Sequence, residues 1–204
     1  RAFLRPVMRR KNLKVVTSAH IEKILFQDRR ARGVRFRHND QVVEVGASAE
    51  VILSAGAIGS PQILELSGIG AGQGLQALGM SCVHDLPGVG ENLQDHMQVR
   101  CVYKTTQPMT LNNEVNSLFG KARIGIEYLL RRGGPMAMAA SHVSAFMRTM
   151  PHVATPDIQF HFQPLSADAP GKGLHRFSAY TSSVTQLRPE SRGTVHIKSP
   201  VASD

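Results

Sequence analysis

The chain contains no tryptophan, few aromatic residues and only two cysteines among its 204 residues. Cys82 and Cys101 stand far apart and outside any CxxC or His-rich spacing, which indicates two reduced thiols in an intracellular protein rather than a disulfide framework. None of the nine histidines lies at ligand spacing from another, so no metal site is predicted. No apolar run approaches the roughly 18 residues of a membrane-spanning helix, so no transmembrane segment is expected.

The beginning of the chain also lacks two features. It does not start with methionine, and residues 1–16 contain no signal-peptide apolar region. We therefore interpret the sequence as the middle segment of a longer protein, without a visible targeting segment.

Positive charge is abundant but unevenly distributed. The net charge is +9, and residues 1–37 hold 12 of the 24 lysines and arginines against only two acids, Glu22 and Asp28. Strand-like segments interrupt these basic residues, and no DNA- or RNA-binding motif accompanies them. The charge therefore indicates solvated strand edges and turns, and no nucleic-acid partner is expected.

The first part of the chain alternates short apolar stretches with polar turns. This pattern predicts an antiparallel meander with strands at 13–17, 21–26 and from residue 34, followed by a further strand after the turn at 39–41. The run Val51–Leu53 then predicts a strand buried on both faces. It is followed by a glycine-rich turn and a short helix capped by Ser60, started by Pro61 and closed by Gly68.

The second part predicts more strands and one long helix. The strands are expected from residue 97, at 141–148 and 157–165, and within 177–187 and 193–199, and the helix over 115–131 ends at a glycine pair. The fold class is therefore α+β. A composition change near residue 96 divides the chain into two parts, 1–95 and 96–204.

One motif is much more specific than these patterns. Residues 56–70, "GAIGSPQILELSGIG", match at every constrained position a signature of the glucose-methanol-choline (GMC) oxidoreductases. The segments 12–36, 86–96 and 191–200 also resemble this family, in the right order and at plausible spacing. The chain is thus identified as similar to a middle segment of a GMC enzyme of the choline dehydrogenase or alcohol dehydrogenase type.

The resemblance implies an FAD-dependent enzyme that oxidises a small-molecule alcohol by hydride transfer to flavin N5. Residues 1–95 would be part of an FAD-binding domain and 96–204 part of an antiparallel-sheet substrate-binding domain. By the same resemblance, the backbone of Ile21 contacts the adenine of FAD, and Ala55 and Gly56 lie against the cofactor. The electron acceptor cannot be read from the sequence; a cytoplasmic location is expected, with peripheral membrane association through an acceptor as the alternative.

Two parts of the family's machinery are missing. No GxGxxG opens a strand–helix–strand unit: "GIGAGQG" follows a helix and "GVGENLQ" follows a loop. The catalytic histidine and its His or Asn partner belong to a later part of the family's sequence. No catalytic residue is therefore expected here, and the segment alone should neither hold FAD properly nor catalyse.

Two histidines are candidates for the lining of the substrate cavity. His161 alternates with two phenylalanines in a predicted strand, and His142 stands where choline-type enzymes of the family carry a glutamate. A histidine at that position argues against choline and for a neutral alcohol, because a quaternary ammonium needs a carboxylate or an aromatic cage.

Two other functions stay open at this stage. A binding module could keep the scaffold without the chemistry, and the family also contains hydroxynitrile lyases that keep FAD without redox turnover. No GxSxG elbow supports hydrolase chemistry.

Overall fold

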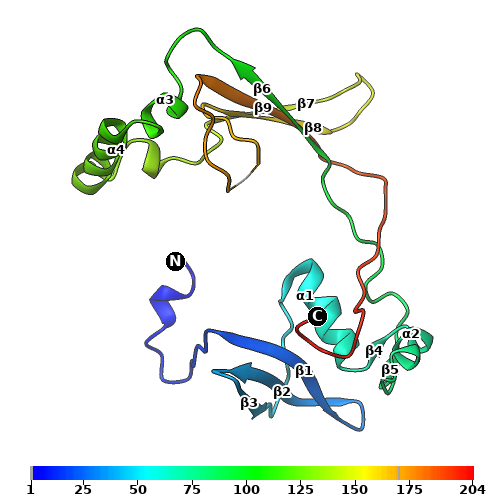
Figure 1. Cartoon of the computed structure of the whole chain (residues 1–204). Helices are drawn as coiled ribbons and strands as arrows, with labels where there is room; N and C mark the ends of the chain where they lie inside the picture. Colours follow the sequence, from blue (N-terminus) through cyan, green and yellow to red (C-terminus); the bar gives the residue numbers. More distant parts are fainter. Residues whose placement is uncertain (1, 170) are drawn as a thin grey trace. The chain divides into compact units, whose positions relative to one another are not determined.

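The computed structural model describes residues 2–169 and 171–204. The chain divides into two compact units (Figure 1). Unit 1 contains the chain up to Leu93 together with Arg192–Asp204, and unit 2 contains Gln94–Ser191. Both units mix helices with antiparallel sheet, which confirms the predicted α+β class.

A three-stranded meander forms the sheet of unit 1, as the sequence predicts. Strands β1 (Ala19–Gln27), β2 (Arg30–His38) and β3 (Gln41–Gly46) pair antiparallel in the order β1-β2-β3. Each hairpin turns over two residues with positive φ, Asp28–Arg29 and Asn39–Asp40. That geometry matches the right-handed twist of the strands. The predicted strand at 13–17 does not form.

Helix α1 (Gly56–Leu66) packs against β1 and begins a turn earlier than predicted. Gly56, at φ +84°, turns the chain into the helix, and Ala55 rather than Ser60 is the N-cap. Pro61 therefore lies inside the helix, where it removes the amide partner of the carbonyl four residues earlier. The predicted end is confirmed, since Gly68 at φ +84° stops the helix after Leu66.

The buried strand predicted at 51–53 is absent. Residues 51–55 belong to no strand, and the side chain of Ile52 is 78% exposed. A strand needs neighbours to satisfy its backbone groups, and no other strand of residues 2–169 and 171–204 pairs with this segment. An apolar run predicts burial but does not identify the surface that covers it.

A small parallel unit follows α1. Strand β4 (Ile69–Gly70), helix α2 (Gly72–Ala77) and strand β5 (His84–Asp85) form a miniature strand–helix–strand unit with β4 parallel to β5. The sequence did not predict this arrangement, because two-residue strands leave no periodic pattern.

Unit 2 is built on a four-stranded antiparallel sheet in the order β6-β9-β8-β7. Its strands are β6 (Gln98–Lys104), β7 (Val143–Met147), β8 (Ile158–Gln163) and β9 (Ala179–Gln186). The helix predicted over 115–131 is confirmed as α4 (Leu118–Arg131), which Ser117 caps, and a short unpredicted helix, α3 (Leu111–Val115), precedes it. Arg132, at φ 51°, ends α4 in place of the expected glycines.

The last segment differs from the predicted division. Residues 192–204, assigned by sequence to the second part, pack with unit 1. They form no strand, and their only β-bridge to the rest of the described chain pairs Gly193 with Leu93. Alternating residues in "GTVHIKS" predict a strand, but this segment is fastened mainly by side chains.

Candidate functional site

Ile21, the predicted adenine contact, lies on β1 opposite Phe36 and is half-buried. The pairing shifts between Ile21 and Lys23, so that Glu22 is an extra residue in the strand. Such a bulge interrupts the ladder and redirects the backbone, and bulges are common beside ligand sites. The carboxylate of Glu22 takes a hydrogen bond of 2.9 Å from Arg37 across the hairpin. The backbone at Ile21 is therefore irregular where the resemblance places a contact.

Ala55 and Gly56 form an exposed turn at the start of α1. The amide of Ala55 donates to the hydroxyl of Ser60 over 3.1 Å, which closes the turn. A Cβ placed on Gly56 would meet nothing within 4 Å, so glycine is required by its positive φ and not by close packing. The backbone here is open to a ligand, next to the partially positive helix N-terminus.

A buried serine joins the two elements that carry these residues. Ser67, at the end of α1, accepts the amide of Ile24 on β1 over 2.8 Å and donates to the carbonyl of Ile63. β1 and α1 are thus fixed to each other within unit 1. In the described part of the chain no hydrogen bond joins Ile21 directly to Ala55 or Gly56.

The glycine-rich segment 68–74 does not offer a second phosphate site, although it opens the miniature strand–helix–strand unit. The Asp85 carboxylate accepts the amide of Gly72 over 2.8 Å at the N-terminus of α2. A carboxylate already occupies the position that a phosphate would take. The prediction that "GIGAGQG" does not open a strand–helix–strand unit is therefore wrong, but the Asp85 carboxylate leaves the start of α2 unsuited to a phosphate.

The sheet of unit 2 has two unlike faces. Along β9 the residues with odd numbers are buried and small or hydroxylated: Ala179, Thr181, Ser183 and Thr185. The opposite face is apolar and more exposed, and it carries Val99, Tyr103, Phe160, Phe162, Tyr180 and Val184. Because strand residues alternate between faces, the register assigns these side chains unambiguously.

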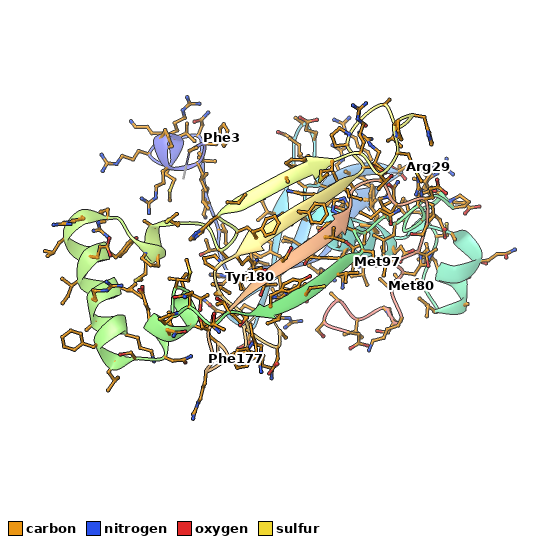
Figure 2. All side chains as sticks on the ribbon, turned by 90° about the horizontal axis from the view of Figure 1, so that it is seen from above. Phe3, Arg29, Met80, Met97, Phe177 and Tyr180 are labelled. Atoms are coloured by element: carbon orange, nitrogen blue, oxygen red, sulfur yellow. The ribbon has the colours of Figure 1, made fainter. Side chains whose placement is uncertain are left out.

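Aromatic rings gather on the apolar face. The rings of Tyr103 and Tyr180 stack at 5.3 Å, and those of Phe160 and Phe162 at 6.4 Å. Tyr180 and Met97 lie toward opposite ends of this sheet (Figure 2). Charge repulsion from Cys101, together with a hydrogen bond to it, raises the pKa of Tyr103 above its ordinary 10.0. The sequence did not single out either tyrosine.

The two candidate histidines lie in different surroundings, His142 just before β7 and His161 within β8. His142 donates its amide to Phe162 over 3.1 Å and lines an open hollow of about 320 Å³ together with Phe162 and Tyr180. His161 lies on the polar face, opposite Ser183, with its ring 3.4 Å from the hydroxyl of Ser144. The structure therefore brings His142, and not His161, to a hollow that the aromatic residues Phe162 and Tyr180 also line.

A buried polar network was missed by sequence reasoning. The Asn112 side chain, fully buried, bonds the backbone and hydroxyl of Ser166 and the carbonyl of His175. His175 in turn contacts the Ser166 hydroxyl at 3.0 Å and Asp168 at 2.9 Å. Ser166 has no exposed surface, so its hydroxyl cannot attack a substrate, and the group Ser166, His175 and Asp168 instead holds a loop in position.

The described residues carry neither a metal cluster nor a membrane-spanning helix. No group of three or more histidine, cysteine or acidic side chains there could hold a metal ion, and no helix there is long and apolar enough to cross a membrane. Both cysteines are free thiols.

Sequence comparisons indicate the class of protein to which this fold is related. Residues 1–98 match the family model described as GMC oxidoreductase. The chain is therefore similar to the GMC oxidoreductases, and FAD is the cofactor of the full-length protein.

Particular relatives sharpen this assignment. The chain is 40% identical over 198 residues to the oxygen-dependent choline dehydrogenase of Brucella canis, and the match covers 97% of this chain and 36% of the relative. It is 39% identical over 204 residues to the enzyme of the same name from Pectobacterium carotovorum, covering 100% and 36%. The chain therefore spans little more than a third of the curated relatives it matches.

Solved structures agree in fold. Formate oxidase from Aspergillus oryzae superposes with a TM-score of 0.85 at 22% identity, over 97% of this chain and 40% of that chain. Pyridoxine 4-oxidase from Mesorbium loti superposes with a TM-score of 0.72 at 27% identity, over 96% and 34%.

Proposed function

We propose that the whole protein is an FAD-dependent oxidoreductase that converts an alcohol into an aldehyde or ketone. In this proposal residues 1–95 contribute to an FAD-binding domain, and the sheet of unit 2 contributes to a substrate-binding domain. The observation that carries the proposal is the family signature at 56–70, which forms α1 and opens it with an exposed left-handed turn at Gly56. The choline dehydrogenase relatives support the reaction class.

The proposal that this chain helps to bind FAD rests on its backbone conformation at two places. The open backbone at Gly56 and the irregular backbone at Ile21 both allow a flat ligand to approach closely. When bound, FAD supplies the hydride acceptor of the reaction. Ile21 would hold the adenine side, and Ala55 and Gly56 would support the cofactor at the turn. This chain supplies no catalytic base in the proposal.

The substrate part rests on the apolar face of unit 2. Aromatic side chains on one face of a rigid sheet can bind the carbon skeleton of an alcohol and exclude water from the reacting carbon. His142 lies at the edge of this face, beside Phe162 and Tyr180. His161 lies on the other face, which makes His142 the better candidate for substrate contact.

The nature of the alcohol follows from the same hollow. None of the residues that line it is acidic: His142, Val143, Phe162, Gln163, Pro164 and Tyr180. A cationic alcohol such as choline would meet only the rings of Phe162 and Tyr180 there and no carboxylate, so we infer that a neutral alcohol is preferred. The names of the curated relatives favour choline instead. A glutamate at position 142 would favour choline, whereas the histidine present there favours a neutral alcohol.

Anaerobic reduction of the purified whole protein tests the reaction class. Its flavin absorbance should bleach when a neutral aliphatic or aromatic alcohol is added, and choline should be a poorer reductant. The H142E variant should lower the KM for choline and raise that for the neutral alcohol. A matched H161Q variant should leave both KM values unchanged.

Each other outcome contradicts part of the proposal. A protein that binds no FAD would be a binding module on the same scaffold. A bound flavin that no alcohol reduces would indicate a lyase. Bleaching by choline equal to that by neutral alcohols, with no effect of H142E, would remove His142 from the substrate cavity.

A further inference from the structure

Glu65 is a charged side chain buried in the interior of unit 1. It lies in the last turn of α1 and is only 4% exposed. Its two carboxylate oxygens bind residues far away in the sequence: one lies 2.7 Å from Nδ1 of His196, and the other accepts the amide of Ile197 over 2.8 Å. A buried carboxylate is costly unless it is fully bonded, so these partners are essential to its stability.

The ring of His196 lies between two carboxylates. Nδ1 faces Glu65, and Nε2 lies 3.1 Å from a carboxylate oxygen of Glu91. A neutral imidazole carries one N–H and can donate to only one of these acids, whereas the imidazolium donates to both. The geometry therefore suits the cationic ring.

The backbone around this cluster joins two distant parts of the chain. Val195 donates its amide to the carbonyl of Gly90 over 2.8 Å, and Leu93 and Gly193 exchange both backbone hydrogen bonds at 2.9 and 2.8 Å. A Cβ on Gly90 would collide with the carbonyl of Val195, so the two segments approach as closely as glycine allows. These segments are the ones through which the chain leaves unit 1 after Leu93 and returns at Arg192.

We propose that Glu65, His196 and Glu91 form a protonation-dependent clasp that fastens the returning segment 192–197 to α1 and to the departing segment 86–93. With His196 protonated, the clasp holds both connections to unit 2 at one place on unit 1. When the proton leaves, one of the two acids loses its donor and the segment loosens. His196 is thus a positioning residue that acts through backbone order.

The charged groups around the ring favour this behaviour. Glu65 from α1 and Glu91 from the preceding loop face it, while Lys198 and Asp204 of its own segment line a neighbouring hollow of about 230 Å³. The hydrogen bond to Glu65 and, less strongly, the charges of both acids raise the pKa of His196 above its ordinary 6.5, against the opposing effect of burial. For a raised histidine pKa, the stabilisation is complete below the unfolded value and is lost as pH rises through the folded one.

Amide hydrogen exchange on the whole protein tests the clasp. After correction for intrinsic exchange, protection of the Val195 and Ile197 amides should fall about tenfold when pH rises from below to above the pKa of His196, the effect of one charge-assisted hydrogen bond. In E91Q only Glu65 remains as a charged partner of the ring, so this pH dependence should become smaller, and the part that persists comes from Glu65. Titration of the His196 ring by NMR should show a lower pKa in E91Q.

The matched control is E44Q, which removes a carboxylate of similar exposure that pairs with Arg35 on the meander. It should keep the full pH dependence at Val195 and Ile197. Protection that does not change with pH in the unmodified protein, or that changes equally in E91Q, would overturn the clasp. Both variants alter half-exposed side chains, so loss of folding does not obscure the result.

Discussion

Unit 1 encloses mainly apolar side chains, whereas unit 2 encloses mainly hydroxyl and amide groups and leaves most of its large apolar side chains exposed. The buried apolar residues of unit 1 are Ile24, Phe36, Ile63, Leu66, Leu75 and Val89. The buried polar residues of unit 2 are Thr110, Asn112, Ser166, Thr181, Ser183 and Thr185. The two units are therefore stabilised in different ways.

This difference has a physical consequence for each unit. Apolar burial is non-directional and tolerates small shifts, so unit 1 needs a few long-range polar bonds, such as those of Ser67 and Glu65, to fix its elements in register. A polar interior is directional, and removing one partner leaves others unsatisfied. Unit 2 gains geometric precision from this network, and most of its large apolar side chains remain exposed.

Removal of the Asn112 side chain should lower the stability of the protein more than the other substitutions below, because it disrupts the polar interior of unit 2. N112A removes a side chain that bonds Ser166 and His175 at once, so we expect unfolding to become easier by about 3 kcal/mol. Denaturant titration and exchange at the Ser166 amide measure the effect. N113A, at the exposed neighbouring residue, should change stability by less than about 0.5 kcal/mol. Equal effects of the two variants would mean that the network contributes nothing.

Replacement of Ser67 tests the long-range hydrogen bond that joins β1 to α1 in unit 1. S67A leaves the Ile24 amide without its acceptor in a buried position, which should cost about 2 kcal/mol in the free energy of unfolding. Because this bond joins β1 to α1, the variant should also retain less FAD when the whole protein is purified. S81A, at an exposed serine, is the control. Full stability with unchanged FAD content would show that apolar packing alone fixes the two elements.

Sequence reasoning succeeded where a few neighbouring residues decide the structure. The two hairpin turns and the end of α1 at Gly68 follow from residues that accept a left-handed backbone, and local sequence records them directly. The turn at Ala55–Gly56 was likewise placed correctly, although the helix begins there rather than at Ser60.

Hydrogen-bond partners that are distant in the sequence could not be predicted from local sequence. Ser67 bonds a residue 43 positions away, and Glu65 one that is 131 positions away, so neither spacing nor periodicity could indicate these pairs. The run at 51–53 failed for a related reason, since burial depends on a covering surface that lies outside the segment itself. For the candidate site, the alternation of His161 with two phenylalanines predicted that they lie on opposite faces of a strand, and the register confirms this. Local sequence could not predict which of the two faces is buried.

A matched pair of glycine substitutions separates conformation from packing in unit 1. G56A introduces a side chain into open space but at φ +84°, so it should destabilise the protein by about 1 kcal/mol through backbone strain alone. G74A also points into open space, yet its glycine lies within α2 with no positive φ. It should stabilise the protein by roughly 0.5 kcal/mol, because alanine favours a helix and restricts the unfolded chain. Thermal unfolding of the two variants should shift in opposite directions.

The smallest effect is expected at the exposed end of the sheet in unit 2, where Asp157 accepts hydrogen bonds from the amide and hydroxyl of Thr149. These bonds lower the pKa of Asp157 below its ordinary 3.8. A depressed carboxylate pKa contributes stability above the unfolded value, and that contribution is lost as pH falls through the folded value. T149V keeps the amide bond and removes only the hydroxyl, so its melting temperature should lie slightly below that of the unmodified protein at pH 7. The difference should vanish at low pH, where the carboxyl is protonated in both proteins.

The control for this pair is T155V, at an exposed threonine that lies two residues before Asp157, and it should show no difference at either pH. A deficit of T149V that persists unchanged at low pH would mean that the exchange of a hydroxyl for a methyl group, rather than the charge of Asp157, accounts for it. In that case the contact between Thr149 and Asp157 would stabilise unit 2 through side-chain packing and not through charge. The two units would then differ less in the kind of interaction that stabilises them.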